Sequence, residues 1–128
     1  MTAIELAKPG DAEAIAAFAN GSYTHTFGHI YDPADLSTFL AGWNPPDRVR
    51  AQIASDDHDI ALVRGESGAI LGYIKMGPVD FELPKEQPTG DAVELHQLYV
   101  AEAAKGTGVA VALMEWGIAW ARERASIL

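Results

Sequence analysis

The segment from Lys105 to Ala110 combines residue types and spacing that could bind a phosphate group. It precedes a stretch with helical periodicity, and a helix N-terminus carries unpaired amides and a partial positive charge. Gly106 and Gly108 lack the Cβ atoms that would keep an anion away from those amides. Lys105 adds a formal positive charge beside the turn. These features favour a phosphate or pyrophosphate ligand that is bound mainly by backbone amides.

Two common nucleotide-binding motifs do not fit this segment. A Walker A loop requires Gly-Lys-Ser/Thr, and no such sequence follows the glycines. The dinucleotide fingerprint requires a third glycine three residues after Gly108, where Val111 stands. A tight strand-to-helix turn also needs glycine for steric reasons alone, so that interpretation stays open at this point.

A strand and a helix must position this turn. The stretch Val93–Val100 predicts a mostly buried strand, and Val109–Arg124 predicts a helix. The helix would have a broad apolar face made of Val109, Leu113, Trp116, Ile118 and Trp120. Alternate strand residues share a face, so Glu94 and His96 would lie side by side as a carboxylate and an imidazole. An ion-paired or structural role for each of these two side chains remains an alternative.

The remaining elements follow from periodicity and turn signals. The pattern predicts, in chain order, a strand within Thr2–Ala7, helices at Asp11–Gly21, Asp32–Leu40 and Asp47–Ser55, a hairpin of Ile60–Val63 with Ala69–Ile74, and a loop at Gly77–Asp91. Asp11 and Asp32 are the expected N-caps, and Pro33 suits a first helical position. Loops as long as the one expected at Gly77–Asp91 often border a functional site.

Composition excludes several classes of protein. The 128 residues, of which 48% are hydrophobic, suffice for one compact domain. Nine basic and 18 acidic residues give a net charge of −9, which disfavours nucleic acid and anionic membranes. The charge ranks a cationic substrate above others, although a role in solubility alone accounts for it more simply. The chain has no cysteine, and its four histidines lack paired ligand spacing, so we expect no metal site. Neither a signal peptide nor a long apolar run is present, which predicts a cytoplasmic protein.

From Val93 to about Ala125 the sequence resembles the acetyl-CoA motif of the GCN5-related N-acetyltransferases (GNAT). In that family a strand reading roughly Glu-Leu-x-x-Leu-Tyr-Val precedes Gln/Arg-x-x-Gly-x-Gly/Ala; here Glu94–Val100 precedes Lys105–Ala110. Lys105 is a departure from the Gln or Arg of the family. The resemblance implies an α/β (α+β) acyl-CoA N-acyltransferase fold with a mixed, mostly antiparallel sheet flanked by helices. Thr26–Gly28, Tyr31 and Asp35-Leu36 resemble a branch that contains polyamine acetyltransferases.

The resemblance also implies the residue roles. Acetyl-CoA would be the cosubstrate, bound through Leu98, Tyr99, Val100, Lys105, Gly106, Thr107, Gly108, Val109 and Ala110. Main-chain groups at Leu98 and Val100 would contact pantetheine and polarise the acetyl carbonyl. Glu94 lies where histone-type members carry the catalytic base, and His96 would tune or replace it. Tyr31 lies where family members hold the acceptor.

The implied reaction is direct attack of a primary amine of a small cationic acceptor, such as a polyamine, on the thioester. Family members normally continue after the motif helix with further strands and the residue that protonates CoA, whereas this sequence ends at Ala125–Leu128, which reads as the start of a strand. Truncation is the favoured explanation, and an exposed sheet edge would allow a homodimer. A catalytically inactive or incomplete acetyl-CoA-binding module and a pure interaction protein are the alternatives.

Overall fold

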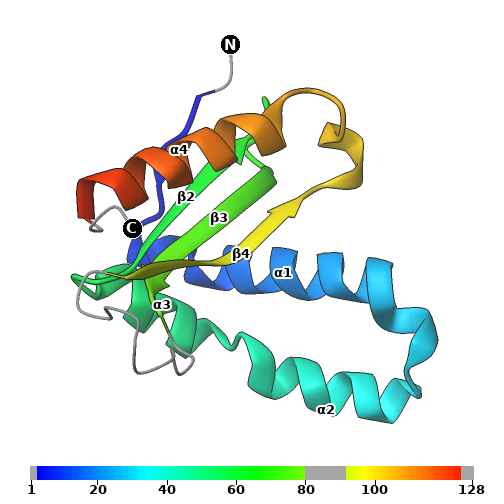
Figure 1. Ribbon diagram of the computed structural model, residues 1–128. Coiled ribbons are helices and arrows are strands. Elements are labelled where there is room, and N and C mark those ends of the chain that lie inside the picture. Colours follow the sequence, from blue (N-terminus) through cyan, green and yellow to red (C-terminus); the bar gives the residue numbers. More distant parts are fainter. Residues whose placement is uncertain (1–2, 80–91, 125–128) are drawn as a thin grey trace.

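Four strands form one antiparallel sheet in the computed structural model, which describes residues 3–79 and 92–124 (Figure 1). The strands are β1 (Glu5–Leu6), β2 (Asp59–Arg64), β3 (Ile70–Pro78) and β4 (Val93–Val100), in the spatial order β1-β2-β3-β4. β4 is an edge strand among the described residues, which explains why it is half-buried instead of mostly buried.

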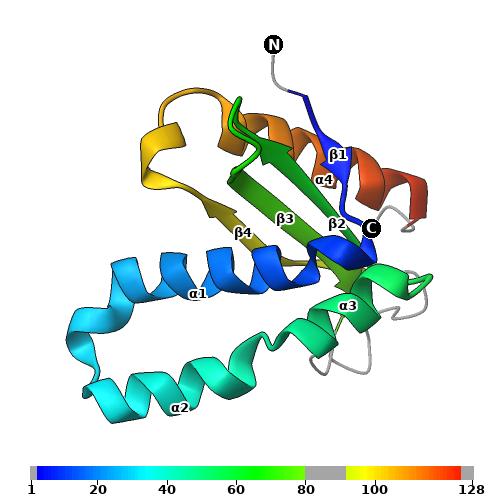
Figure 2. The same cartoon turned by 180° about the vertical axis from the view of Figure 1, so that it is seen from behind.

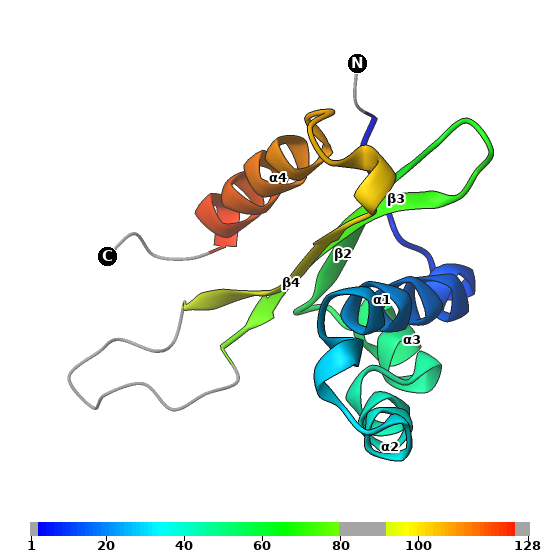
Figure 3. The same ribbon diagram turned by 90° about the vertical axis from the view of Figure 1, so that its right-hand side faces the viewer.

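Helices cover both faces of this sheet. They are α1 (Ala12–Phe27), α2 (Pro33–Trp43), α3 (Pro46–Ala54) and α4 (Val109–Arg124), with short 3-10 turns η1 (Pro9–Asp11), η2 (Gly28–Ile30) and η3 (Glu102–Ala104). The side view shows α4 on one face of the sheet and α1, α2 and α3 on the other (Figure 3). The view from behind shows α1 crossing the sheet, with α2 outside it (Figure 2). The expected fold class is confirmed, with every described strand pair antiparallel.

The alternation of side chains along the strands divides the core in two. Leu62 and Tyr73 are fully buried with Ile15 of α1 on the face that α1 and α3 cover. Ile74 points to the other face and is fully buried with Leu113 of α4. Both faces of the central strands are therefore apolar, as a sheet between two helical layers requires.

The register between β3 and β4 contains one irregularity. Lys75 pairs with Gln97 and Met76 pairs with Leu95, so His96 is an extra residue on β4. Such a bulge changes the direction of side chains on the bulged strand. The position of His96 therefore depends on the pairing of two strands as well as on its place in the sequence.

The prediction that the first helix ends near Asn20-Gly21 is wrong. α1 continues through Gly21 to Phe27. Beyond Gly21, its Tyr23 packs against Phe39 and Trp43 of α2, and these contacts offset the cost of an internal glycine, about 1 kcal/mol. Asp11 does not cap the helix with its side chain. Its carboxylate instead accepts a hydrogen bond from the backbone amide of Lys8 at 2.8 Å and pairs with Arg64 at 2.7 Å.

Three further features differ from the sequence prediction: the end of β3, the packed face of α4 and the N-cap of α2. β3 extends through Gly77 and Pro78, which were expected in a loop, and the rest of that loop lies outside the described residues from position 80 onward. Ile118 is 45% exposed and does not belong to the packed face of α4, which centres on Gly117. Asp32 precedes α2 without a side-chain capping bond, although Pro33 is its first residue as expected. The strand expected at Ala125–Leu128 also lies outside the described residues.

Gly117 allows α4 to lie close to the sheet. A Cβ atom at this position would be 2.7 Å from Ile74 Cδ1 and 3.3 Å from Met76 Sδ. We expect Gly117→Val to lower the free energy of unfolding by about 1–3 kcal/mol through overpacking, measured by urea denaturation. Gly42→Val in α2 is the matched control, because nothing lies within 4 Å of the Cβ position there. Equal stability of the two variants would contradict this role of Gly117.

No helix in the described ranges has both the length and the apolar composition that a membrane span requires.

Candidate functional site

A pocket of about 550 Å³ lies between the C-terminal half of α1 and the segment that leads from β4 to α4. Its lining comprises Phe18, Gly21, Ser22, His25, Thr26, Leu98, Tyr99, Val100, Ala101, Glu102, Lys105 and Ala110. Five of the residues predicted to bind a cofactor are in this set. The tertiary structure thus brings the end of β4 and the two ends of the glycine turn, Lys105 and Ala110, to one cavity, whereas Gly106–Val109 are not among its lining residues.

The glycine turn has the backbone conformation that its sequence suggests. Gly106 has φ +83° and Gly108 has φ +92°, in the left-handed region that other residues rarely adopt. Nothing lies within 4 Å of the position that a Cβ atom would take at either glycine. The glycines therefore serve backbone geometry and leave open space above the turn, which is what a group bound to the amides requires.

α4 begins directly after this turn. The amide of Ala112 donates to the carbonyl of Gly108 at 3.0 Å and is the first to close a full helical turn. The amides of the preceding three residues have no partner within the helix and lie at its positive end. The side chain of Val109 is only 4% exposed and packs in the core, so this residue can offer a ligand only its backbone. Thr107 is held to the turn, since its amide and its hydroxyl both donate to the Ala104 carbonyl.

Lys105 lies at the pocket, but its charge is already engaged. Its Nζ lies 2.8 Å from Oε2 of Glu102. The hydrogen bond and the positive charge of Lys105 lower the pKa of Glu102 below its ordinary value. Glu102 and Lys105 are three positions apart, a spacing at which side chains of a helical turn can meet, so this ion pair could have been recognised in the sequence.

The last three residues of β4, Leu98, Tyr99 and Val100, line the pocket. Leu98 and Val100 pack toward the α4 side of the sheet, whereas Tyr99 packs on the opposite side. The Tyr99 ring lies 5.8 Å from Tyr73 and 6.0 Å from Trp43. Burial raises the pKa of Tyr99. All three of these β4 side chains are engaged in packing.

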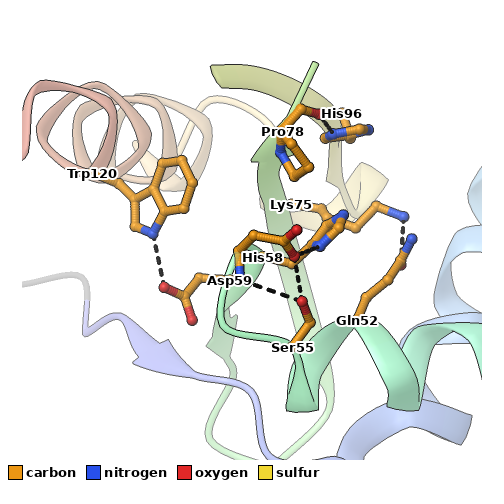
Figure 4. Close-up of polar contacts among 9 residues, drawn as sticks. Gln52, Ser55, His58, Asp59, Lys75, Pro78, His96 and Trp120 are labelled. Atoms are coloured by element: carbon orange, nitrogen blue, oxygen red, sulfur yellow. Dashed lines mark hydrogen bonds and ion pairs between the residues drawn. The ribbon is translucent and has the colours of Figure 1, made fainter. Parts of the chain in front are cut away.

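Glu94 and His96 lie near each other, as the alternation predicts, with His96 Nδ1 3.9 Å from Glu94 Oε2. His96 Nε2 lies 2.8 Å from the carbonyl of Pro78 (Figure 4). A carbonyl only accepts, so Nε2 of His96 donates this hydrogen bond. Neither residue lines the 550 Å³ pocket; both lie on the half of β4 farther from the glycine turn.

A second histidine that sequence analysis did not single out lies beside His96. The ring of His58 is 5.6 Å from that of His96, centre to centre, and its Nδ1 is 2.7 Å from Asp57 Oδ1. Ser55 donates to the same carboxylate, and this bond and that of His58 lower the pKa of Asp57. No local pattern indicates this proximity, because the two histidines are 38 positions apart in the sequence.

Tyr31 belongs to an aromatic cluster between α1 and α2, outside the 550 Å³ pocket. Its hydroxyl lies 2.6 Å from that of Tyr23. This hydrogen bond, with burial and the neighbouring tyrosines, raises the pKa of Tyr23 to about 12. Rings of Phe27, Phe39 and Trp43 each lie 4.9 Å from Tyr23. Trp43 connects the cluster to Tyr99 of β4.

The buried side chains of Asn44 and Tyr73 form hydrogen bonds with Gln97 of β4. Gln97 Oε1 accepts hydrogen bonds from the Tyr73 hydroxyl at 2.6 Å and from Asn44 Nδ2 at 3.3 Å. Burial raises the pKa of Tyr73 well above its ordinary value. Asn44 is 53 residues from Gln97 in the sequence, so only the fold could reveal this contact.

Across residues 3–79 and 92–124, no group of three or more His, Asp or Glu side chains has an arrangement that could hold a metal ion.

Residues 14–127 match the family model described as the acetyltransferase (GNAT) family. A comparison with curated proteins gives no match. Among solved structures, the chain is similar to the PaiA N-acetyltransferase from Thermoplasma acidophilum in complex with coenzyme A. The TM-score is 0.77 at 13% identity, over 96% of this chain and 73% of that one.

Two further structures have the same fold. One is a ribosomal-protein-alanine N-acetyltransferase from Brucella melitensis, with a TM-score of 0.60 at 18% identity over 97% of this chain and 74% of that one. The other is the aminoglycoside 6′-N-acetyltransferase AAC(6′)-Ih from Acinetobacter baumannii, with a TM-score of 0.66 at 12% identity over 96% of this chain and 73% of that one.

Proposed function

The chain belongs to the GNAT acetyltransferase family, and on this premise we propose that it transfers the acetyl group of acetyl-CoA to a primary amine of a small cationic acceptor. The observation that carries the proposal is the open, positive-φ glycine turn at the edge of a 550 Å³ pocket. By family resemblance the activity is that of an acetyl-CoA-dependent N-acetyltransferase.

An acyl-CoA ligand would extend from the pocket to the glycine turn at its edge. The amides of the turn and of the first residues of α4 would hold the pyrophosphate, because they are grouped at a positive helix end without a covering side chain. The backbone of Leu98, Tyr99 and Val100 would contact pantetheine, since these residues line the same pocket. Acetyl-CoA supplies the acetyl group as a thioester.

Glu94 is the proposed base in this mechanism. An amine attacks only in its neutral form, so a proton must leave the nitrogen as the C–N bond forms and the C–S bond breaks. Glu94 would accept that proton, through water because it lies outside the pocket. His96 Nδ1 lies 3.9 Å from Oε2 of Glu94 and would share the proton. CoA leaves as the thiol after it gains a proton, so the overall reaction is balanced.

Charge and aromatic side chains support a cationic acceptor as the proposed substrate class. Eighteen acidic residues against nine basic ones attract a cation over much of the surface. Tyr31 and its aromatic neighbours, which reach β4 through Trp43, offer ring faces that attract ammonium groups. A polyamine, with a second charged nitrogen, would suit such a surface.

Turnover by the purified chain tests the proposal. We expect release of free CoA thiol from acetyl-CoA that depends on an added polyamine or aminoglycoside, measured with a thiol reagent, with formation of the acetylated amine shown by mass spectrometry. Reactions without acceptor are the control. Saturable acetyl-CoA binding without turnover of either acceptor would reject the catalytic proposal and favour a binding module.

A further inference from the structure

The carboxylate of Glu102 lies between a lysine and a histidine side chain at the proposed cofactor pocket. Its Oε2 is 2.8 Å from Lys105 Nζ and 3.7 Å from His25 Nε2. His25 projects from α1, whereas Glu102 and Lys105 belong to the segment between β4 and α4. All three residues line the pocket, so the contact joins its two walls.

The nitrogen groups of Lys105 and His25 are placed as in an anion-binding site, and the carboxylate of Glu102 takes the place of the anion. One oxygen atom faces both nitrogen groups, and Lys105 favours its ionised form. The fold does not depend on this contact for stability, because the three side chains are 62–69% exposed and such surface pairs contribute little. A ligand with a more highly charged anion can therefore displace Glu102 without disturbing the fold.

We propose that Glu102 occupies the place that a phosphate group of the acyl-CoA ligand takes on binding, and that His25 is a second side chain that binds this phosphate. The proposal rests on the proposed function, since it concerns the same pocket. A phosphate competes well because it carries more charge and more acceptor oxygens than a carboxylate. The ligand must still displace Glu102 before it can contact Lys105, so the carboxylate lowers the affinity of the chain for its own ligand.

Removing the competing charge should therefore tighten binding. We expect Glu102→Gln to lower the Kd for acetyl-CoA by about three- to tenfold, as expected for one exposed charge near a charged ligand, measured by isothermal titration calorimetry. Adding His25→Gln to that variant should reverse part of the gain, because the phosphate then loses its partner on α1. Glu13→Gln is the matched control, since it makes the same charge change on α1 at an exposed position 4.0 Å from Arg50.

The outcomes distinguish this inference from the proposed function. Tighter binding by Glu102→Gln, with the Kd of Glu13→Gln close to that of the wild type, supports the competing role of Glu102. A Kd for Glu102→Gln equal to or higher than that of a binding-competent wild type overturns the inference and leaves the proposed function intact. Absence of acetyl-CoA binding in the wild type overturns both. Glu102→Ala tests whether the effect is specific to glutamine. Circular dichroism melting curves show whether each variant is folded.

Discussion

Replacing Gly108 with glutamate is expected to weaken acetyl-CoA binding by about 10²-fold or more, because two like charges in direct contact cost several kcal/mol. Gly108 has φ +92°, so any side chain there strains the turn by about 1–2 kcal/mol. The new carboxylate would also project into the open space above the turn, where the ligand phosphates are proposed to lie. Steric bulk, charge and backbone strain thus all act against binding.

Calorimetric titration with acetyl-CoA measures this effect, and two further variants separate its causes. Gly108→Ala introduces the strain without the charge and should weaken binding less than Gly108→Glu. Gly42→Glu carries the same charge in α2, at a glycine with open space and without a positive φ, and should leave the Kd close to that of the wild type. Full affinity in Gly108→Glu would show that the glycine turn does not bind the ligand.

Replacing Glu94 with glutamine is expected to lower kcat for amine acetylation by about 10²- to 10³-fold, within the usual range for loss of a general base. Glutamine keeps the size of the side chain and its packing near His96 but cannot accept a proton. The Kd for acetyl-CoA should not change, because Glu94 lies outside the pocket that the ligand would occupy. A lower kcat with an unchanged Kd for acetyl-CoA would identify a catalytic effect.

Steady-state kinetics at saturating acceptor would measure the change in turnover. Glu66→Gln, in the turn between β2 and β3, is a control with the same change of charge at an exposed position. Turnover by Glu94→Gln within twofold of the wild type would exclude Glu94 as the base. His96→Gln then becomes the next variant, because its Nδ1 lies on the same side as that carboxylate.

The glycine turn was predictable from sequence because it is local. Gly106 and Gly108 lie on one short segment between a strand and a helix, and the positive φ of both is a property of that segment. Boundaries were less predictable where tertiary packing overrides local signals. Gly21 resembles a helix end, yet α1 continues past it, and the following turn packs against α2 through contacts of Tyr23 with Phe39 and Trp43. Ile118 fits an apolar pattern, yet the close contact at Gly117 determines which face of α4 is buried.

By itself the sequence determined the α/β fold class, the order of its elements and the glycine turn within residues 105–110, since periodicity and glycine geometry act over a few residues. Only the tertiary structure decided the relation of His25 to Glu102, of His58 to His96 and of Asn44 to Gln97. Each of these contacts joins elements that are distant in the chain. Their distances depend on how helices pack on a sheet and on where a bulge falls, and no local pattern of residues encodes either of these.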